Sequence, residues 1–177
     1  MPSPIAHLTA GYVAYRLGRG AVSQPGTEAQ RNARELMLVT ATFSMLPDVD
    51  SIVGLLAGDF GRFHNNVTHS LLVGAAISLG FAGIMASRRG RFRFWFLVAA
   101  GCYSAHVLMD GATWGRGVMA LWPISERRFL SPLPLFYGLH WSDGLFSVRH
   151  LWTVSTELLF TLLTMVFWWV WPVSKRF

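Results

Sequence analysis

Charged residues are scarce in this sequence of 177 residues. Asp, Glu, Lys and Arg together make up 14% of it, whereas they make up about a quarter of a typical soluble domain. Hydrophobic residues make up 53%, and the mean hydropathy is +0.40. The composition argues against an ordinary soluble protein and indicates a lipid bilayer as the surrounding medium. The length predicts a single domain, residues 1–177.

Cysteine and acidic residues are also few. The single Cys102 lies in an apolar run, which excludes an intrachain disulfide and predicts a buried thiol. Nine acidic residues face fifteen Lys and Arg, giving a net charge of +6. Such an excess can indicate nucleic-acid binding. Here the basic residues lie mainly in short loops between apolar runs, which is typical of a membrane topology signal, and we expect no nucleic acid as a stable partner.

Long hydrophobic runs are fewer than the composition suggests. Five apolar segments are present: Ile5 to Leu17, Leu36 to Leu46, Leu71 to Ala86, Phe94 to Met109 and Leu151 to Trp171. Only the last reaches the roughly 20 residues that a perpendicular membrane span requires. Some helices should therefore begin or end below the bilayer surface, where protein or a water-filled cavity satisfies their backbone. The sequence predicts an all-α polytopic membrane bundle of four or five helices, in which Gly74, Ser78 and Ala82 allow one helix to approach a neighbour closely.

The basic residues predict the orientation, assuming that each segment crosses once. No basic residue precedes the first apolar stretch, unlike in a secretory signal peptide, so we expect insertion to depend on these segments themselves. Ten basic residues fall on one side: Arg16, Arg19, Arg31, Arg34, Arg88, Arg89, Arg91, Arg93, Lys175 and Arg176. Five fall on the other: Arg62, Arg116, Arg127, Arg128 and Arg149. The side with ten should be cytoplasmic, which places the long connection from Gly111 to His150 outside.

The same crossings bring seven potential metal ligands to the outer face from four helix ends. These residues are His7, Asp48, Asp50, His64, His69, His106 and Asp110. An Asp near bilayer depth costs about 2.5 to 3.5 kcal/mol at mid-helix unless it is paired or hydrated, and a divalent cation would offset that cost. Mixed imidazole and carboxylate ligands suit zinc or manganese better than calcium, which prefers oxygen. The number of ions stays open.

Local patterns support this convergence. His106 and Asp110 are four residues apart and therefore share one helix face. Asp48 and Asp50 follow Pro47, which predicts a turn at the helix end. Asn66 or Thr68 is expected to cap the third long helix. Glu157, about two turns into the last helix, is expected either to face the cavity or to pair with a buried partner.

The order of these motifs also resembles a known family. Pro47-Asp48-Val49-Asp50, His64-Asn65-Asn66-Val67-Thr68-His69-Ser70, His106-Val107-Leu108-Met109-Asp110 and Trp122-Pro123 are similar to the YdjM-like family of inner-membrane metal-dependent hydrolases. That family distantly resembles zinc-dependent phospholipase C and P1 nuclease, which are helical enzymes that cleave phosphate esters. The resemblance implies an inner-membrane phosphoester hydrolase. Asn65 departs from the pattern, in which an Arg commonly follows the first His. The role of that Arg, in contacting the phosphate or supporting the ligands, is therefore expected to be missing or to be taken by Arg62 or Arg116, which are the candidate substrate-binding residues.

The predicted function is therefore hydrolysis of a phosphate ester at the outer membrane-water interface. Asp48, Asp50, His69, His106 and Asp110 would bind the ions, His7 and His64 would complete the shell, and Asp50 and His64 are the candidate catalytic residues, with Asp50 as the base. His140 is expected to extend the substrate site from its loop, unless it forms a solvated pair with Asp143. A lipid phosphoester is the favoured substrate, and a small phosphoester from water is the other option. The alternative is a non-catalytic membrane module that binds a metal or a partner protein; a transporter is disfavoured because the cluster lies at one face.

Overall fold

The computed structural model describes residues 2–22, 27–139 and 147–170, and within them every regular element is helical. Five long helices form the bundle: α1 (Pro4–Val22), α2 (Thr27–Met45), α5 (Leu71–Arg89), α6 (Phe92–Gly111) and α7 (His150–Val170). Four short elements join α2 to α5: η1 (Leu46–Asp48), α3 (Val49–Leu56), α4 (Phe60–Phe63) and η2 (Val67–His69). The predicted all-α bundle is confirmed.

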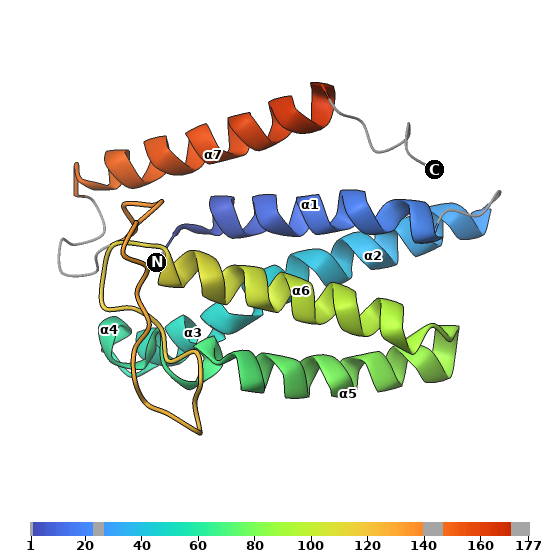
Figure 1. Ribbon diagram of the computed structural model, residues 1–177, viewed down its shortest axis with the longest axis horizontal. Coiled ribbons are helices and arrows are strands. Elements are labelled where there is room, and N and C mark those ends of the chain that lie inside the picture. The colour runs from blue at the N-terminus through green and yellow to red at the C-terminus, as the bar shows by residue number, and fades with distance from the viewer. Residues whose placement is uncertain (1, 23–26, 140–146, 171–177) are drawn as a thin grey trace.

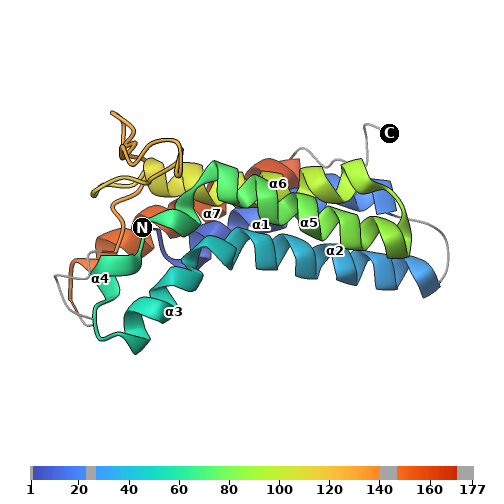
Figure 2. The same ribbon diagram turned by 90° about the horizontal axis from the view of Figure 1, so that it is seen from below.

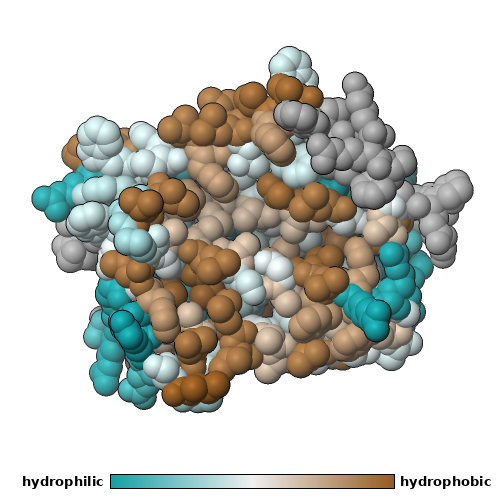
Figure 3. Space-filling model, viewed as in Figure 1, coloured by the Kyte–Doolittle hydropathy of each residue, from teal (hydrophilic) through white to brown (hydrophobic). Residues whose placement is uncertain are grey.

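Consecutive long helices run in opposite directions along the bundle (Figures 1 and 2). Four stretches are long and apolar enough to cross a membrane: Gln30–Leu56, Leu71–Arg89, Phe92–Gly111 and His150–Val170. The space-filling view shows a hydrophobic band with hydrophilic residues toward both ends (Figure 3). Exposed side chains such as Leu97 and Leu163 belong to this band and suit contact with lipid.

Close packing of α5 against α6 depends on the small residues that the sequence indicated. Gly74, Ser78 and Ala82 are the buried residues of α5. A Cβ atom at Gly74 would lie 2.3 Å from a ring carbon of Tyr103 on α6, so only glycine fits there. Cys102, next to Tyr103, is buried and free, as expected.

Two local predictions differ from the structure. The turn expected after Pro47 is helical, because Pro47 lies in the first turn of η1, where a missing N–H costs nothing, and α3 follows directly. The cap of α5 is Ser70, whose Oγ accepts hydrogen bonds from Leu72 N and Val73 N. Neither Asn66 nor Thr68 caps α5, since Asn66 precedes η2 and Thr68 lies within it.

The described part of the long outer connection folds back over the end of α6. Val118 and Phe129 form an antiparallel bridge, and Ser131 N donates to Gly111 O at 2.7 Å. Hydrogen bonds join the start of α1 to α7. Ser3, directly before α1, donates from its backbone N–H, at 2.6 Å, and from its hydroxyl to the Glu157 carboxylate. Glu157 thus has a buried partner, which was one of its two predicted states.

Candidate metal centre

All seven predicted ligands lie at the end of the bundle where α1 begins and α2 and α6 end. His7 is in the first turns of α1, Asp48 ends η1, and Asp50 is in the first turn of α3. His64 follows α4, His69 ends η2, and His106 and Asp110 lie in the last two turns of α6. His7, His69 and His106 are fully buried. Residues up to 103 positions apart along the chain, from His7 to Asp110, therefore share one enclosed polar cluster.

The cluster divides into two groups of ligand atoms. Asp48, His64, His69 and Asp110 offer one ligand atom each, and these atoms all lie within 4.8 Å of one another. His7, Asp48 and His106 form a second group by the same measure. Asp48 belongs to both groups, so its carboxylate lies where two ions would share a ligand.

Asp110 also faces both groups. Its Oδ2 atom lies 3.1 Å from Nε2 of His69 and 3.7 Å from Nε2 of His64, within the first group. Its Oδ1 atom lies 3.3 Å from Nε2 of His7, in the second. The His7 ring stacks on that of His106, with centroids 3.7 Å apart. Two carboxylates thus lie between two sets of imidazoles.

Most atoms that face the centre lack hydrogen-bond partners among the described residues, and the exceptions are Nε2 of His69 and Nε2 of His106, which lie 3.2 Å apart. Both oxygens of Asp48, both oxygens of Asp110, both ring nitrogens of His7 and Nε2 of His64 are buried without completing a hydrogen bond. Buried polar atoms are rarely left so, because each costs about 1 to 3 kcal/mol, and more when it is charged. Imidazole nitrogen and carboxylate oxygen atoms that face one another without other partners are the ligands that a zinc-like divalent ion requires. The residues present therefore fit a metal site.

The outward nitrogen atoms of three rings, by contrast, have partners. Nδ1 of His106 lies 2.7 Å from the carbonyl oxygen of Ser44. A carbonyl only accepts, so Nδ1 is the protonated atom, and in the neutral ring the Nε2 lone pair is available 3.4 Å from Asp48 Oδ1. Asp50 lies 2.9 Å from Nδ1 of His64 and 3.2 Å from Nδ1 of His69. Asp50 belongs to neither ligand group.

Burial disfavours the charged form of His69, but contacts of its ring with Asp110, Asp48 and Asp50 outweigh this effect. They hold the pKa of His69 well above its ordinary value. Three carboxylates around one imidazole therefore create a strongly negative centre, which attracts a proton or a metal ion.

Several neighbours that the sequence analysis did not assign to the site support these residues. The Thr68 hydroxyl donates to Asp50 Oδ2 at 2.6 Å, and the Tyr103 hydroxyl donates to the Thr68 carbonyl. Arg128 donates to the carbonyl oxygens of Asn65 and Gly117, both at 3.1 Å, and so braces the loop that carries His64. Among these supporting residues, only Thr68 could have been expected from the sequence, because it directly precedes His69. The other contacts join segments that are distant in the chain.

The predicted phosphate-contacting residues occupy different settings. Arg116 donates to the carbonyl oxygen of His64, so it lies beside the centre and holds its backbone. Arg62 is exposed, with its guanidinium 5.8 Å from the Phe63 ring. His140 and Asp143 lie outside the described residues, as do Trp171, Lys175 and Arg176.

Fold and site together define a multi-pass helical membrane protein with a buried histidine and aspartate cluster at one end of its bundle. The model of the family described as YdjM inner membrane protein matches residues 1–176, and the chain belongs to this family. It is thus an inner-membrane protein, as the resemblance implied.

The chain is also similar to the "Inner membrane protein YbcI" of Escherichia coli (strain K12), with 32% identity over 101 residues. The match covers 55% of the chain and 58% of that protein, so the chain spans little more than half of this relative's length. No solved structure matches the chain significantly. Neither match bears on the more distant resemblance to phospholipase C and P1 nuclease, which stays a prediction.

Proposed function

We propose that the cluster is a two-ion divalent metal centre and that the protein hydrolyses phosphate esters, with a lipid phosphoester as the favoured substrate. The observation that supports this most directly is the sharing of Asp48 by two ligand groups, in which the oxygens of Asp48 and Asp110 and the nitrogens of His7 lack hydrogen-bond partners among the described residues. Zinc, or manganese in its place, suits the mixture of imidazole and carboxylate ligands. When bound, such ions supply Lewis acidity toward a phosphoryl oxygen and acidify a water molecule.

The two groups suggest different tasks. His64, His69, Asp48 and Asp110 provide four ligands, enough for a closed tetrahedral site. His7, His106 and the shared Asp48 provide three. With Asp110 assigned to the first group, although its Oδ1 lies 3.3 Å from Nε2 of His7, a position stays open in the second for water or substrate. Catalysis requires such an open position, so we assign substrate binding to the second group.

Asp50 and His64 are the candidate residues for proton transfer. Asp50 contacts Nδ1 of His64 and Nδ1 of His69, so it orients both rings with Nε2 toward the centre. His64 is the least buried of the four clustered imidazoles, at 4% exposed, and its Nε2 has no hydrogen-bond partner. When Nε2 of His64 holds an ion and Nδ1 faces Asp50, this ring has no free nitrogen for a further proton. Asp50 is therefore the proposed base, and it also orients the His64 ring.

A non-catalytic metal module is the second candidate. It is favoured by the complete burial of His7, His69 and His106, since a structural metal site is closed. The two functions differ in one measurable respect, because both bind metal but only the enzyme turns over a substrate.

The test begins with protein purified in detergent, stripped with a chelator and reloaded with zinc or manganese. Mass spectrometry of the bound elements should give two ions per chain, and a panel of lipid and water-soluble phosphomonoesters and phosphodiesters should reveal turnover. Asp48→Asn should lose both ions and the activity. Asp59→Asn is the matched control, because Asp59 is an exposed carboxylate that only caps α4. Two bound ions with no turnover on any ester would support the structural module instead.

A further inference from the structure

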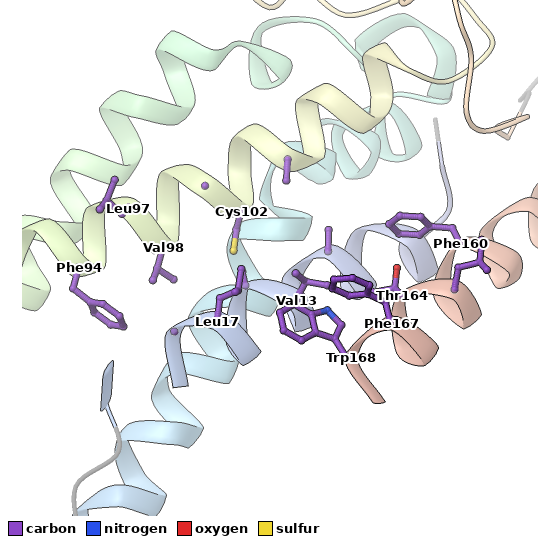
Figure 4. Close-up of a pocket in the computed structure, with 16 residues that line it drawn as sticks. Val13, Leu17, Phe94, Leu97, Val98, Cys102, Phe160, Thr164, Phe167 and Trp168 are labelled. Atoms are coloured by element: carbon purple, nitrogen blue, oxygen red, sulfur yellow. The ribbon is translucent and has the colours of Figure 1, made fainter. Parts of the chain in front are cut away.

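A groove with a volume of about 900 Å³ lies between α1, α6 and α7 (Figure 4). Small residues on α1 and α6, such as Ala14 and Gly101, leave this space open, and α7 walls it with bulky side chains such as Phe167. Its lining is apolar except for the Cys102 thiol, the Thr164 hydroxyl and one indole nitrogen. The volume lies within the range of pockets that bind small ligands.

The groove lies within the membrane-spanning part of the bundle. Its lining residues on α6 and α7 all fall inside the two spans Phe92–Gly111 and His150–Val170. Water is a poor occupant, because a bound water needs two to four polar partners. An empty space of this size forfeits the contacts that stabilise packed interiors. A hydrocarbon chain therefore fits the groove best.

The length of the groove fits one such chain. Its lining on α6 extends from Phe94 to Ala105, which is roughly 16 Å at about 1.5 Å per residue. This is close to half of the roughly 30 Å hydrocarbon core, the depth that the chains of one leaflet fill. At the inner end, the Arg16 guanidinium lies 5.9 Å from the ring of Trp168, so a charged group bounds the apolar stretch.

The other end of the groove adjoins the candidate metal centre. Ala105 directly precedes His106, and Ala10 follows His7 by three residues, which is less than one helical turn. His7 and His106 are the two imidazoles of the second ligand group. Near this end, α7 is joined to α1 by a 2.9 Å hydrogen bond between the hydroxyls of Thr9 and Thr161.

We propose that this groove binds an acyl chain of the substrate, so that the phosphate of the same lipid lies beside His7 and His106. The inference rests on the proposed function and narrows its substrate class to phosphoesters of long-chain lipids. A water-soluble phosphoester would use only the metal-proximal end and would leave the groove to bulk lipid.

A photo-crosslinking experiment tests occupancy without requiring turnover. The protein is placed in lipid nanodiscs that contain phosphatidylcholine with a diazirine at the end of one acyl chain, and labelled peptides are identified after illumination. Gly101 lines the groove, so Gly101→Leu fills it. Gly80→Leu on the exposed face of α5 is the matched control. A Cβ atom meets nothing within 4 Å at either glycine, so neither substitution creates a clash at that atom. In Gly101→Leu the new side chain should displace one or two methylenes of the acyl chain from the groove. Labelling of the α1 segment 13–18 should therefore fall roughly four- to fifteenfold, the effect of losing the burial of those methylenes. Equal labelling in the two variants would overturn the inference.

Hydrolysis then separates this inference from the proposed function. Lipids with one phosphoester headgroup and either long or short acyl chains are compared. Gly101→Leu should raise the KM for the long-chain lipid relative to the short-chain one, and Gly80→Leu should not. Turnover that needs Asp48 but shows no such chain-length effect would overturn the groove inference alone. Labelling that depends on Gly101 without any turnover would overturn the proposed function, and with it the assignment of the bound chain to a substrate.

Discussion

The Asp50 carboxylate lies 2.9 Å from Nδ1 of His64, whereas Nε2 of the same ring lies 3.7 Å from the ligand Asp110. It reaches Nδ1 of His69 at 3.2 Å as well, so one carboxylate orients two imidazoles. Such outer partners fix the ring orientation and raise the basicity of the nitrogen that faces the metal.

Substitutions at Asp50 and Asp48 should therefore have different effects. Asp50→Ala should weaken metal binding by roughly 10- to 100-fold while both ions still bind at saturating concentration. Asp48→Asn should lower the stoichiometry itself, because Asp48 belongs to both ligand groups. Competition titrations with a chromophoric chelator measure both quantities. Equal loss of stoichiometry in the two variants would show that Asp50 is itself a ligand.

His106→Ala should abolish phosphoester hydrolysis and leave the protein folded. The substitution removes one of three ligands from the second group, whereas most of the fold comes from helix packing in the bilayer. Thermal unfolding in detergent and turnover, each compared with the wild type, measure the two effects. His106→Gln keeps more of the side-chain volume and serves as a second variant if the alanine variant unfolds. A folded variant with near-normal turnover would exclude His106 from catalysis.

Metal uptake should release protons, and the affinity should fall as the pH falls. The pKa of His69 is held well above its ordinary value, so at neutral pH the metal-free protein carries a proton that an ion must displace. Calorimetric titrations in buffers of different ionisation enthalpy count the released protons. An affinity that does not rise from about pH 6.5, the ordinary pKa of histidine, upward toward the raised pKa of His69 would contradict this expectation.

The basic end of the bundle should be cytoplasmic. Eight of the ten basic residues predicted to be cytoplasmic belong to the described part of the chain. They lie on α1, α2 and α5 and at the start of α6, toward the end of the bundle opposite the metal ligands (Figure 1). Arg88→Cys should resist an impermeant thiol reagent added outside intact cells, and Glu126→Cys on the opposite side should react. Both positions are exposed, and the native Cys102 is buried and should stay silent. The reverse labelling pattern would invert the topology.

Gly74→Ala should destabilise the bundle by about 1 to 3 kcal/mol, the usual cost of overpacking. The added Cβ would lie 2.3 Å from a ring carbon of Tyr103, so α5 and α6 must separate. Gly80→Ala is the control on the same helix, because its Cβ meets nothing within 4 Å. Unfolding midpoints in detergent should fall for the first variant and hold or rise for the second. A fall of equal size in both would indicate a general effect of the substitution on α5.

The sequence by itself determined the helices, their alternation and the gathering of seven polar residues at one end. Apolar runs must form helices in a bilayer, because every backbone group there needs an internal partner. Alternate crossings then bring the beginning of one helix and the end of the next to the same side. Small residues four positions apart on a helix allow another helix to approach closely, so Gly74, Ser78 and Ala82 indicated such a contact before the partner helix was known.

Only the tertiary structure decided which nitrogen meets which oxygen. Asp48 and Asp50 are two residues apart and chemically identical, yet Asp48 faces two ligand groups and Asp50 lies behind two of the rings. That difference arises from the helical path through η1 and α3 and from the hydrogen bond that Thr68 donates to Asp50, which joins two separate segments of the chain. Ligand geometry depends on displacements of about an ångström, and these are set by side-chain packing between helices, which no local pattern in the sequence records.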